Sequence, residues 1–213
     1  MRALLFVAIA VALGGCAKKA ATHEVNHDLI RITSDARLRT DQIGEGKWLE
    51  LATFVLVEAE NTSSEGAYVT LTGELANEAG TKISELKPQS LWVPAGEIRT
   101  FALIDRERKP RPDAKGASIR VRGARVGHPP PAHVDQFKQL TDGDKILVQG
   151  TITNEAARGG SIMVIASFYG ADGRPMTRPF SLLWVEGHQG QPVQFVGPPG
   201  STRGTIFIGE TAY

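Results

Sequence analysis

VLVEAEN at residues 55–61 and VQGTITN at residues 148–154 are the two stretches that decide the fold. In each, apolar or small side chains recur at every second position and lead to an asparagine, Asn61 or Asn154. A period of two places these side chains on one face of a β-strand. Asparagine is a common turn residue, so each strand is expected to end there. The same unit of strand and turn thus occurs twice.

The match between the two regions continues beyond the asparagines. Each region has a second alternating run, followed by a turn glycine, Gly80 or Gly173. Both then contain Leu-Trp-Val, with tryptophans Trp92 and Trp184, and later a phenylalanine at 101 or 195. The spacing between equivalent residues stays at 92 to 94 positions throughout. A register held this closely predicts two copies of one domain.

Each copy is expected to consist of β-strands. β-Branched residues are dense in the apolar runs, and clusters of Asn, Asp, Ser and Gly separate those runs. No window keeps apolar residues at helical spacing for three turns. Short strands in copies of about 80–90 residues are typical of immunoglobulin-like sandwiches. The predicted fold class is all-β, with two tandem immunoglobulin-like antiparallel β-sandwich domains after a signal peptide.

The segments around the repeats complete the expected organisation. Residues 29–126 form the first domain, opened by a strand over 29–39, and residues 134–213 form the second. Strands over 119–126 and 204–209 are expected to be the matching outer strands. Residues 127–133 contain three consecutive prolines and predict a semi-rigid linker. Residues 16–28 are polar and are expected to form a tether.

The N-terminus has the form of a secretory signal. Met1 and Arg2 precede an apolar run of 11 residues, which is too short to span a bilayer as a helix. Gly14 and Gly15 follow, and then Cys16, the one cysteine of the chain. Leu-Gly-Gly-Cys at 13–16 resembles the lipobox of bacterial lipoproteins. The resemblance implies cleavage after residue 15 and fatty acylation of Cys16, and Ala17 after it favours the outer membrane.

Composition excludes several classes of protein. The 213 residues include 24 basic and 23 acidic ones, for a net charge of +1, with 41% hydrophobic residues. A near-neutral chain of this kind is an ordinary globular protein and not a general nucleic-acid binder. One cysteine excludes an internal disulfide framework and a cysteine-based metal site.

The repeat itself resembles a known module. The second copy has Gly150-x-x-x-Asn154 and then Phe168-Tyr169 before Asp172-Gly173, while the first has Pro94-x-Gly96-Glu97 before Phe101. Together these resemble the FxLYD-like immunoglobulin-like domains of bacterial extracytoplasmic proteins. The first copy lacks the aromatic pair, and the second lacks Pro-Gly-Glu. The resemblance implies fold and compartment, with no catalytic residues and no general ligand.

One stretch departs from the even charge balance. Between residues 105 and 125 there are eight basic and three acidic residues. An anionic partner is one interpretation: lipid headgroups, lipopolysaccharide phosphates or an acidic protein face. A solvated hairpin tip is the other. The predicted partner-binding residues are Arg106, Arg108, Lys109 and Arg111.

The remaining motifs do not predict a catalytic, phosphate-binding or dedicated metal site. His23 and His27 have i, i+4 spacing, but in a polar tether they predict no more than an adventitious metal site. GEGK at 44–47 lacks the Ser or Thr of a phosphate loop. Trp92 and Trp184 are expected to pack within the sandwiches, and Trp48 is either an exposed contact residue or a cover for a sheet edge. We expect no enzyme, no cofactor and no metal.

The sequence therefore predicts a non-catalytic lipoprotein of the bacterial cell envelope, on the periplasmic or the surface side. It would be anchored in the membrane through lipid on Cys16 and would bind or scaffold an envelope protein. The alternative is an accessory protein that binds a small ligand or a metal between its two domains. A deep seam lined by converging polar groups would favour the alternative. A free edge strand or a flat apolar patch would favour a protein partner.

Overall fold

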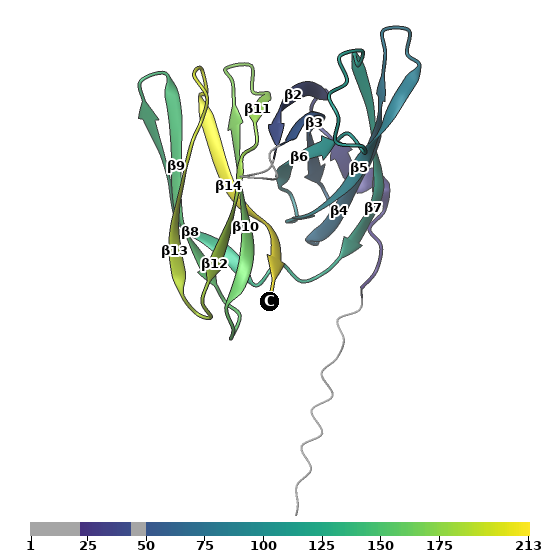
Figure 1. Cartoon of the computed structure of the whole chain (residues 1–213). Coiled ribbons are helices and arrows are strands. Elements are labelled where there is room, and N and C mark those ends of the chain that lie inside the picture. The colour runs from purple at the N-terminus through teal and green to yellow at the C-terminus, as the bar shows by residue number, and fades with distance from the viewer. Residues whose placement is uncertain (1–21, 44–49) are drawn as a thin grey trace, which may run out of the picture.

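The structure is a computed structural model that describes residues 22–43 and 50–213. Its strands pair antiparallel and form two sandwiches that lie side by side (Figure 1). Within the described residues, the one helical element is a single 3₁₀ turn, η1 (His27–Leu29). The predicted all-β class is confirmed. No helix among these residues is long and apolar enough to cross a membrane.

The first sandwich pairs two sheets. In one sheet, β3 lies between β6 on one side and the two short strands β1 and β2 on the other. The other sheet has the order β5-β4-β7. The bounds are β1 (Ile30–Ile32), β2 (Arg37–Ile43), β3 (Glu50–Asn61), β4 (Ala67–Ala76), β5 (Lys82–Val93), β6 (Ile98–Ile104) and β7 (Gly116–Val126).

The second sandwich has the same strand order. One sheet runs β13-β9-β8, and in the other β10 lies between β14 and the pair β11 and β12. The bounds are β8 (Ala132–Asp142), β9 (Lys145–Asn154), β10 (Gly160–Tyr169), β11 (Pro175–Thr177), β12 (Phe180–Val185), β13 (Gly190–Val196) and β14 (Arg203–Ala212). Each strand of the second sandwich thus has a counterpart at the equivalent position in the sheets of the first.

The two sandwiches differ where a strand is interrupted. The opening strand expected over 29–39 is divided into β1 and β2, because Ser34 turns back to accept a hydrogen bond from the Glu58 amide at 2.8 Å. Its counterpart β8 is continuous but contains a bulge, with Gln136 at a positive φ of 51°. β11 and β12 are separate where β5 is continuous, and Pro179 stands in the gap without an amide hydrogen to donate.

Each sandwich has its own core, and side chains from both sheets contribute to it. In the first, Val55, Val57 and Phe101 pack against residues such as Val69 and Leu71 of the opposite sheet. In the second, the corresponding layers are built from residues including Val148, Ile152, Ile162, Val164 and Phe195. These are the alternating positions that the sequence predicts to share one face of each strand.

A buried asparagine joins the two sheets of each sandwich. The Nδ2 group of Asn61 donates to the carbonyl of Val93, at the end of β5, at 3.0 Å and to that of Glu65 at 2.8 Å. Asn154 makes the equivalent bonds, to Val185 O at 2.9 Å and to Arg158 O at 3.0 Å. Both asparagines have no exposed surface. Each amide therefore holds the end of a strand in one sheet to the end of a strand in the other.

The repeated tryptophans pack in the same way in the two sandwiches, but they do so on the outer faces of their sheets and not in the cores. Trp184 is 62% exposed, and Trp92 is partly exposed. Each follows a core-facing residue along its strand and therefore points to the opposite face. There the indole covers a glycine in the turn before the paired strand, β4 or β10. A Cβ on Gly66 would lie 2.5 Å from Trp92, and one on Gly159 would lie 3.0 Å from Trp184.

The predicted tether is also shorter than expected. Residues 23–25 lie along the end of β7, where the Val25 amide donates to Ala124 O at 2.9 Å and the Val126 amide donates to His23 O at 3.0 Å. Val25 is buried in the first core. This one apolar side chain, in an otherwise polar segment, brings the segment onto the sheet. Cys16, Trp48, Gly44 and the signal segment lie outside the described residues.

We expect Asn61→Ala and Asn154→Ala each to lower the free energy of unfolding by about 2–3 kcal/mol. Each substitution removes at least two hydrogen bonds to main-chain carbonyls, and an unsatisfied buried polar group costs about 1–3 kcal/mol. Urea unfolding followed by circular dichroism measures the loss. Asn77→Ala is the matched control, since Asn77 accepts a single bond in an exposed turn. A loss no larger than that of the control would contradict the role given to the buried asparagines.

Candidate functional site

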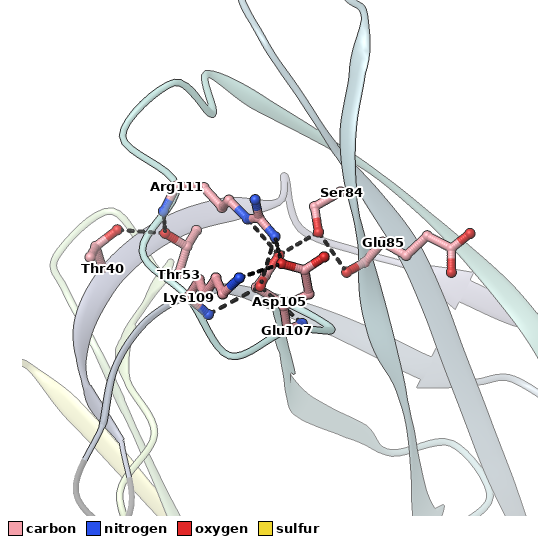
Figure 2. A network of polar contacts seen from close by, with 8 residues as sticks. All are labelled: Thr40, Thr53, Ser84, Glu85, Asp105, Glu107, Lys109 and Arg111. Carbon is pink, nitrogen blue, oxygen red and sulfur yellow. Dashed lines mark hydrogen bonds and ion pairs between the residues drawn. The ribbon is translucent and has the colours of Figure 1, made fainter.

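The first part of the basic stretch is folded around a buried acid. Asp105, at the end of β6, has no exposed surface, and the loop from β6 to β7 wraps around its carboxylate (Figure 2). We call the five residues that meet there the Asp105 network: Ser84, Asp105, Glu107, Lys109 and Arg111.

The carboxylate of Asp105 accepts hydrogen bonds from every side. The Ser84 hydroxyl and Arg111 Nε, the latter at 3.0 Å, donate to Oδ1. The main-chain amides of Glu107 and Lys109 both donate to Oδ2 at 3.1 Å. Burial acts to raise the pKa of Asp105, but the bonds from Ser84, Arg111 and Lys109 and the charge of Arg111 outweigh it. The pKa is therefore below its ordinary value.

Threonines extend the Asp105 network into the neighbouring strands. Thr53 Oγ1 accepts a bond from the Arg111 amide at 2.7 Å and lies 2.8 Å from Thr40 Oγ1 (Figure 2). The Asp105 amide donates to Thr53 O at 2.9 Å, and the Thr53 amide donates to Lys109 O at 3.0 Å. The loop is thus fixed to β2, β3 and β5. Both oxygens of the Asp105 carboxylate are thus engaged in bonds that fix the loop.

The four predicted partner-binding residues lie in this loop. Arg106, Lys109 and Arg111 pair with acids that belong either to the loop or to β5. Arg106 pairs with Glu85, and Lys109 Nζ lies 3.0 Å from Glu107 Oε2. Arg111 pairs with both Asp105 and Glu107, each at 3.0 Å. Arg108 occupies the turn with a positive φ of 55°. Nothing in these contacts tests binding, so the role of the four residues stays a prediction.

The second part of the basic stretch lies on a β-strand and not in a loop. Arg120, Arg122 and Arg125 lie on β7 and are exposed. Within the described residues, no ion pair or side-chain hydrogen bond engages their guanidinium groups. Three of the five net positive charges of this region therefore lie on a strand face, outside the loop that connects β6 to β7.

A second cluster lies at the seam, the interface between the two sandwiches. The outer face of the sheet of β10, β12 and β14 supplies Ile165 and Phe207 to the core of the first sandwich. Polar bonds surround this apolar contact: Thr100 Oγ1 lies 2.9 Å from the Tyr169 hydroxyl, and Arg178 Nε donates to Thr100 O at 2.7 Å. Arg39 donates across the seam to Met176 O at 3.0 Å. The second sandwich thus covers β6, an edge strand of the first.

The ionisable groups of the seam are strongly affected by burial. Burial raises the pKa of Glu58, although the hydrogen bond from Tyr169 and the charge of Arg203 oppose it. Burial lowers the pKa of Arg178 to about 9, so this guanidinium remains positive at neutral pH. Arg178 and Arg99 lie 5.9 and 5.1 Å from the centre of the Phe207 ring, within the range of cation–π attraction. These contacts hold the two sandwiches in one relative position.

A cavity of about 580 Å³ opens beside the seam. Its polar groups are largely occupied by one another: Arg99 lies 2.6 Å from Glu97, and His133 lies 2.8 Å from Asp135 and 3.0 Å from Glu155. The indole nitrogen of Trp92 is the exception, since it is buried and has no hydrogen-bond partner within residues 22–43 and 50–213. The lining residues are Trp92, Arg99, Pro129, Pro130, Ala132, His133, Val134, Glu155, Ile206, Phe207 and Ile208.

The histidines do not gather into a metal site in the part of the chain that the structure describes. No group of three or more His, Cys, Asp or Glu side chains there is placed to hold a metal ion. His23 is paired with Glu65 at 3.0 Å. His27 lies in the 3₁₀ turn η1.

Sequence reasoning missed the centre of the loop and the seam. Asp105 was counted only as one acid among the basic residues, although an Asp at a strand end can accept main-chain amides of the turn that follows. The seam residues Glu58, Thr100, Tyr169 and Arg178 carry no such local signal. Their partners lie in the other sandwich, and a strand pattern does not show which outer face is covered.

The sequence matches no known protein family and no curated protein. Among solved structures, the chain is similar to a β-glucuronidase from glycoside hydrolase family 2, with 12% sequence identity and a TM-score of 0.29. The similarity covers 75% of this chain and 21% of that chain. The chain therefore spans about a fifth of the β-glucuronidase. A likeness at this level says nothing about activity.

We expect Asp105→Asn to lower the free energy of unfolding by roughly 3 kcal/mol at neutral pH, because it leaves Arg111 without its buried partner. The folded-state pKa of Asp105 is depressed, so the ionised carboxylate stabilises the fold at pH values above about 4. That stabilisation is lost as the pH falls through the folded-state pKa.

The difference in free energy of unfolding between the wild type and Asp105→Asn should therefore become smaller as the pH is lowered. Urea unfolding at a series of pH values measures it. Asp113→Asn, an exposed acid in the same loop, is the control. A difference that stays constant with pH would refute the account of Asp105.

Proposed function

We propose that the chain is a non-catalytic lipoprotein of the bacterial cell envelope that binds or scaffolds a protein partner. Lipid on Cys16 would hold it to the membrane, and Ala17 supports the outer membrane. The described polar clusters support a structural role. The Asp105 network saturates its own carboxylate, and the groups of the seam bond mainly to one another.

The observation that carries this proposal is the exposed edge strand β12. Leu182 is 57% exposed and Trp184 is 62% exposed, and both lie on the outer face of the strand. Phe180, on the same face, packs against the first core. An apolar strip therefore continues from the seam out onto a free edge. Edge strands with exposed apolar side chains suit the addition of a partner's strand, in which main-chain bonds give affinity and side chains give specificity.

A second candidate function is binding of a small apolar ligand in the seam cavity. The volume of about 580 Å³ and the Trp92 and Phe207 rings in its lining favour it. Ligand pockets of this size are usually apolar with a few polar groups that fix the ligand. Among the described residues that line the cavity, the buried indole nitrogen of Trp92 is a polar group without a hydrogen-bond partner.

Lipid anchoring predicts that the wild-type chain incorporates labelled palmitate in a bacterial host and remains in the membrane fraction. Cys16→Ala should incorporate none and should move to the soluble or inner-membrane fraction as the uncleaved form. Label and fraction are read after electrophoresis of separated envelopes. Equal labelling of the two proteins would exclude Cys16 as the acylated residue.

Partner binding through β12 predicts that Leu182→Lys reduces the recovery of a cross-linked envelope protein at least tenfold, because a charge on an edge strand opposes strand addition. Leu140→Lys is the matched control, since Leu140 is an exposed leucine on another edge strand, β8. Arg106→Glu with Lys109→Glu tests the predicted role of the loop and leaves Arg111 in place. Recovery that does not depend on Leu182 would exclude β12 as the binding edge.

A further inference from the structure

The outer face of β7 carries three positive charges that the described part of the protein does not neutralise. We call Arg120, Arg122 and Arg125 the arginine face. Their neighbours Ile119 and Val121 pack against the first core, and Ala124 is buried in it. The arginines between them therefore point away from the core. β7 contains a β-bulge opposite Thr70 and Leu71 of β4. The extra residue of this bulge keeps Arg122 and Arg125 exposed on the same side.

The surroundings of the arginine face leave its charge uncompensated. Thr70 and Thr72, uncharged residues, lie next to it on β4. Glu74 further along β4 is already paired with Lys82 at 2.8 Å. Glu24 faces Arg125 through a main-chain bridge, with no ion pair between them in the described residues. The face thus differs from the loop of Arg106, Lys109 and Arg111, where acidic partners cancel the charge.

The N-terminal segment brings the arginine face close to the anchor point. Residues 23–25 pair with the end of β7, next to Arg125. Six residues separate Cys16 from His23, and an extended chain covers at most about 3.3–3.6 Å per residue. A lipid on Cys16 would therefore hold the end of β7 within roughly 25 Å of the membrane surface.

We propose that the arginine face docks onto the phosphate groups of anionic lipid headgroups. The inference builds on the proposed function, since anchoring at Cys16 supplies the proximity. Guanidinium groups bind phosphate through paired hydrogen bonds, and they are more weakly hydrated than ammonium groups. Docking would lay the first sandwich on its side against the bilayer, with β7 along the surface.

The direct test uses the chain from Ala17 onward, which lacks the anchor but keeps every described element. It is floated with vesicles of phosphatidylcholine alone or with one third phosphatidylglycerol, at low salt. A basic residue at an anionic surface contributes about fivefold in affinity. We therefore expect the anionic vesicles to bind the protein, and Arg120→Gln/Arg122→Gln/Arg125→Gln to weaken that binding on the order of 100-fold.

The matched control removes the same charge elsewhere. Lys138→Gln/Lys145→Gln/Arg174→Gln changes three basic residues of the second sandwich and should bind as the wild type does. Equal weakening in both triple variants would overturn the proposal, because net charge would then explain the binding. Binding to soluble polyglutamate but not to anionic vesicles would also overturn it, in favour of an acidic macromolecule.

The orientation is tested with the lipidated full chain in the same two kinds of vesicle. An arginine-modifying dicarbonyl, followed by mass spectrometry, gives the reaction rate at each arginine. We expect at least fivefold slower modification of the arginine face in anionic vesicles, reversed by 1 M salt, with exposed Arg174 unaffected. Equal rates in both vesicles would refute docking. Loss of anchoring would appear instead as failure to float with phosphatidylcholine alone, so the two failures are distinguishable.

Discussion

The structure depends on a single buried amide in each sandwich. Hydrogen bonds between strands run within a sheet, so the two sheets of a sandwich are held together mainly by apolar contact, which has no direction. The amides of Asn61 and Asn154 add direction, since each donates across the sandwich to the end of a strand in the other sheet. The neighbouring residues then take fixed places. Gly66 follows one acceptor and Trp92 precedes the other, and the indole lies over the glycine. The same three-residue arrangement recurs around Gly159 and Trp184.

Features that depend on neighbouring residues along the chain could be predicted from the sequence, and features that depend on the other sandwich could not. The alternating runs and the two asparagines are local features, and they predict the strands and the repeat because each side chain faces its own core. The outer-face positions of Trp92 and Trp184 could not be predicted, because a period of two does not say which face of the strand is inside. Val25 is a single apolar residue in a polar segment and forms no pattern. Its burial in the first core nevertheless makes the tether shorter than predicted. Ile165 and Phe207 resemble solvent-facing residues of a strand, and only their contact with the first sandwich explains their burial.

The basic stretch shows how folding redistributes charge that looks uniform along the chain. Loop residues can reach acids on neighbouring strands, so Arg106 meets Glu85 and Arg111 meets Asp105. Alternate residues of an edge strand project to one side, and Arg120 finds threonine and not an acid beside it. A linear count therefore treats the whole stretch alike, whereas the fold pairs several charges of the loop between β6 and β7 with acids and exposes the arginines along β7. The same logic applies to the seam, where Arg178 is charged but buried and its charge serves the packing of Phe207.

The pairing of residues 23–25 with β7 also sets how the protein would bear mechanical load. A lipid-anchored protein is pulled at its N-terminus whenever its partner moves relative to the membrane. The Val25 and Val126 amide bonds lie side by side across two antiparallel segments. A pull along the axis of β7 strains these bonds together, in shear, and drags the buried Val25 side chain with them. A pull away from the sheet would break them one after another. The join between residues 23–25 and the first sandwich would therefore be strongest when tension runs parallel to the strand.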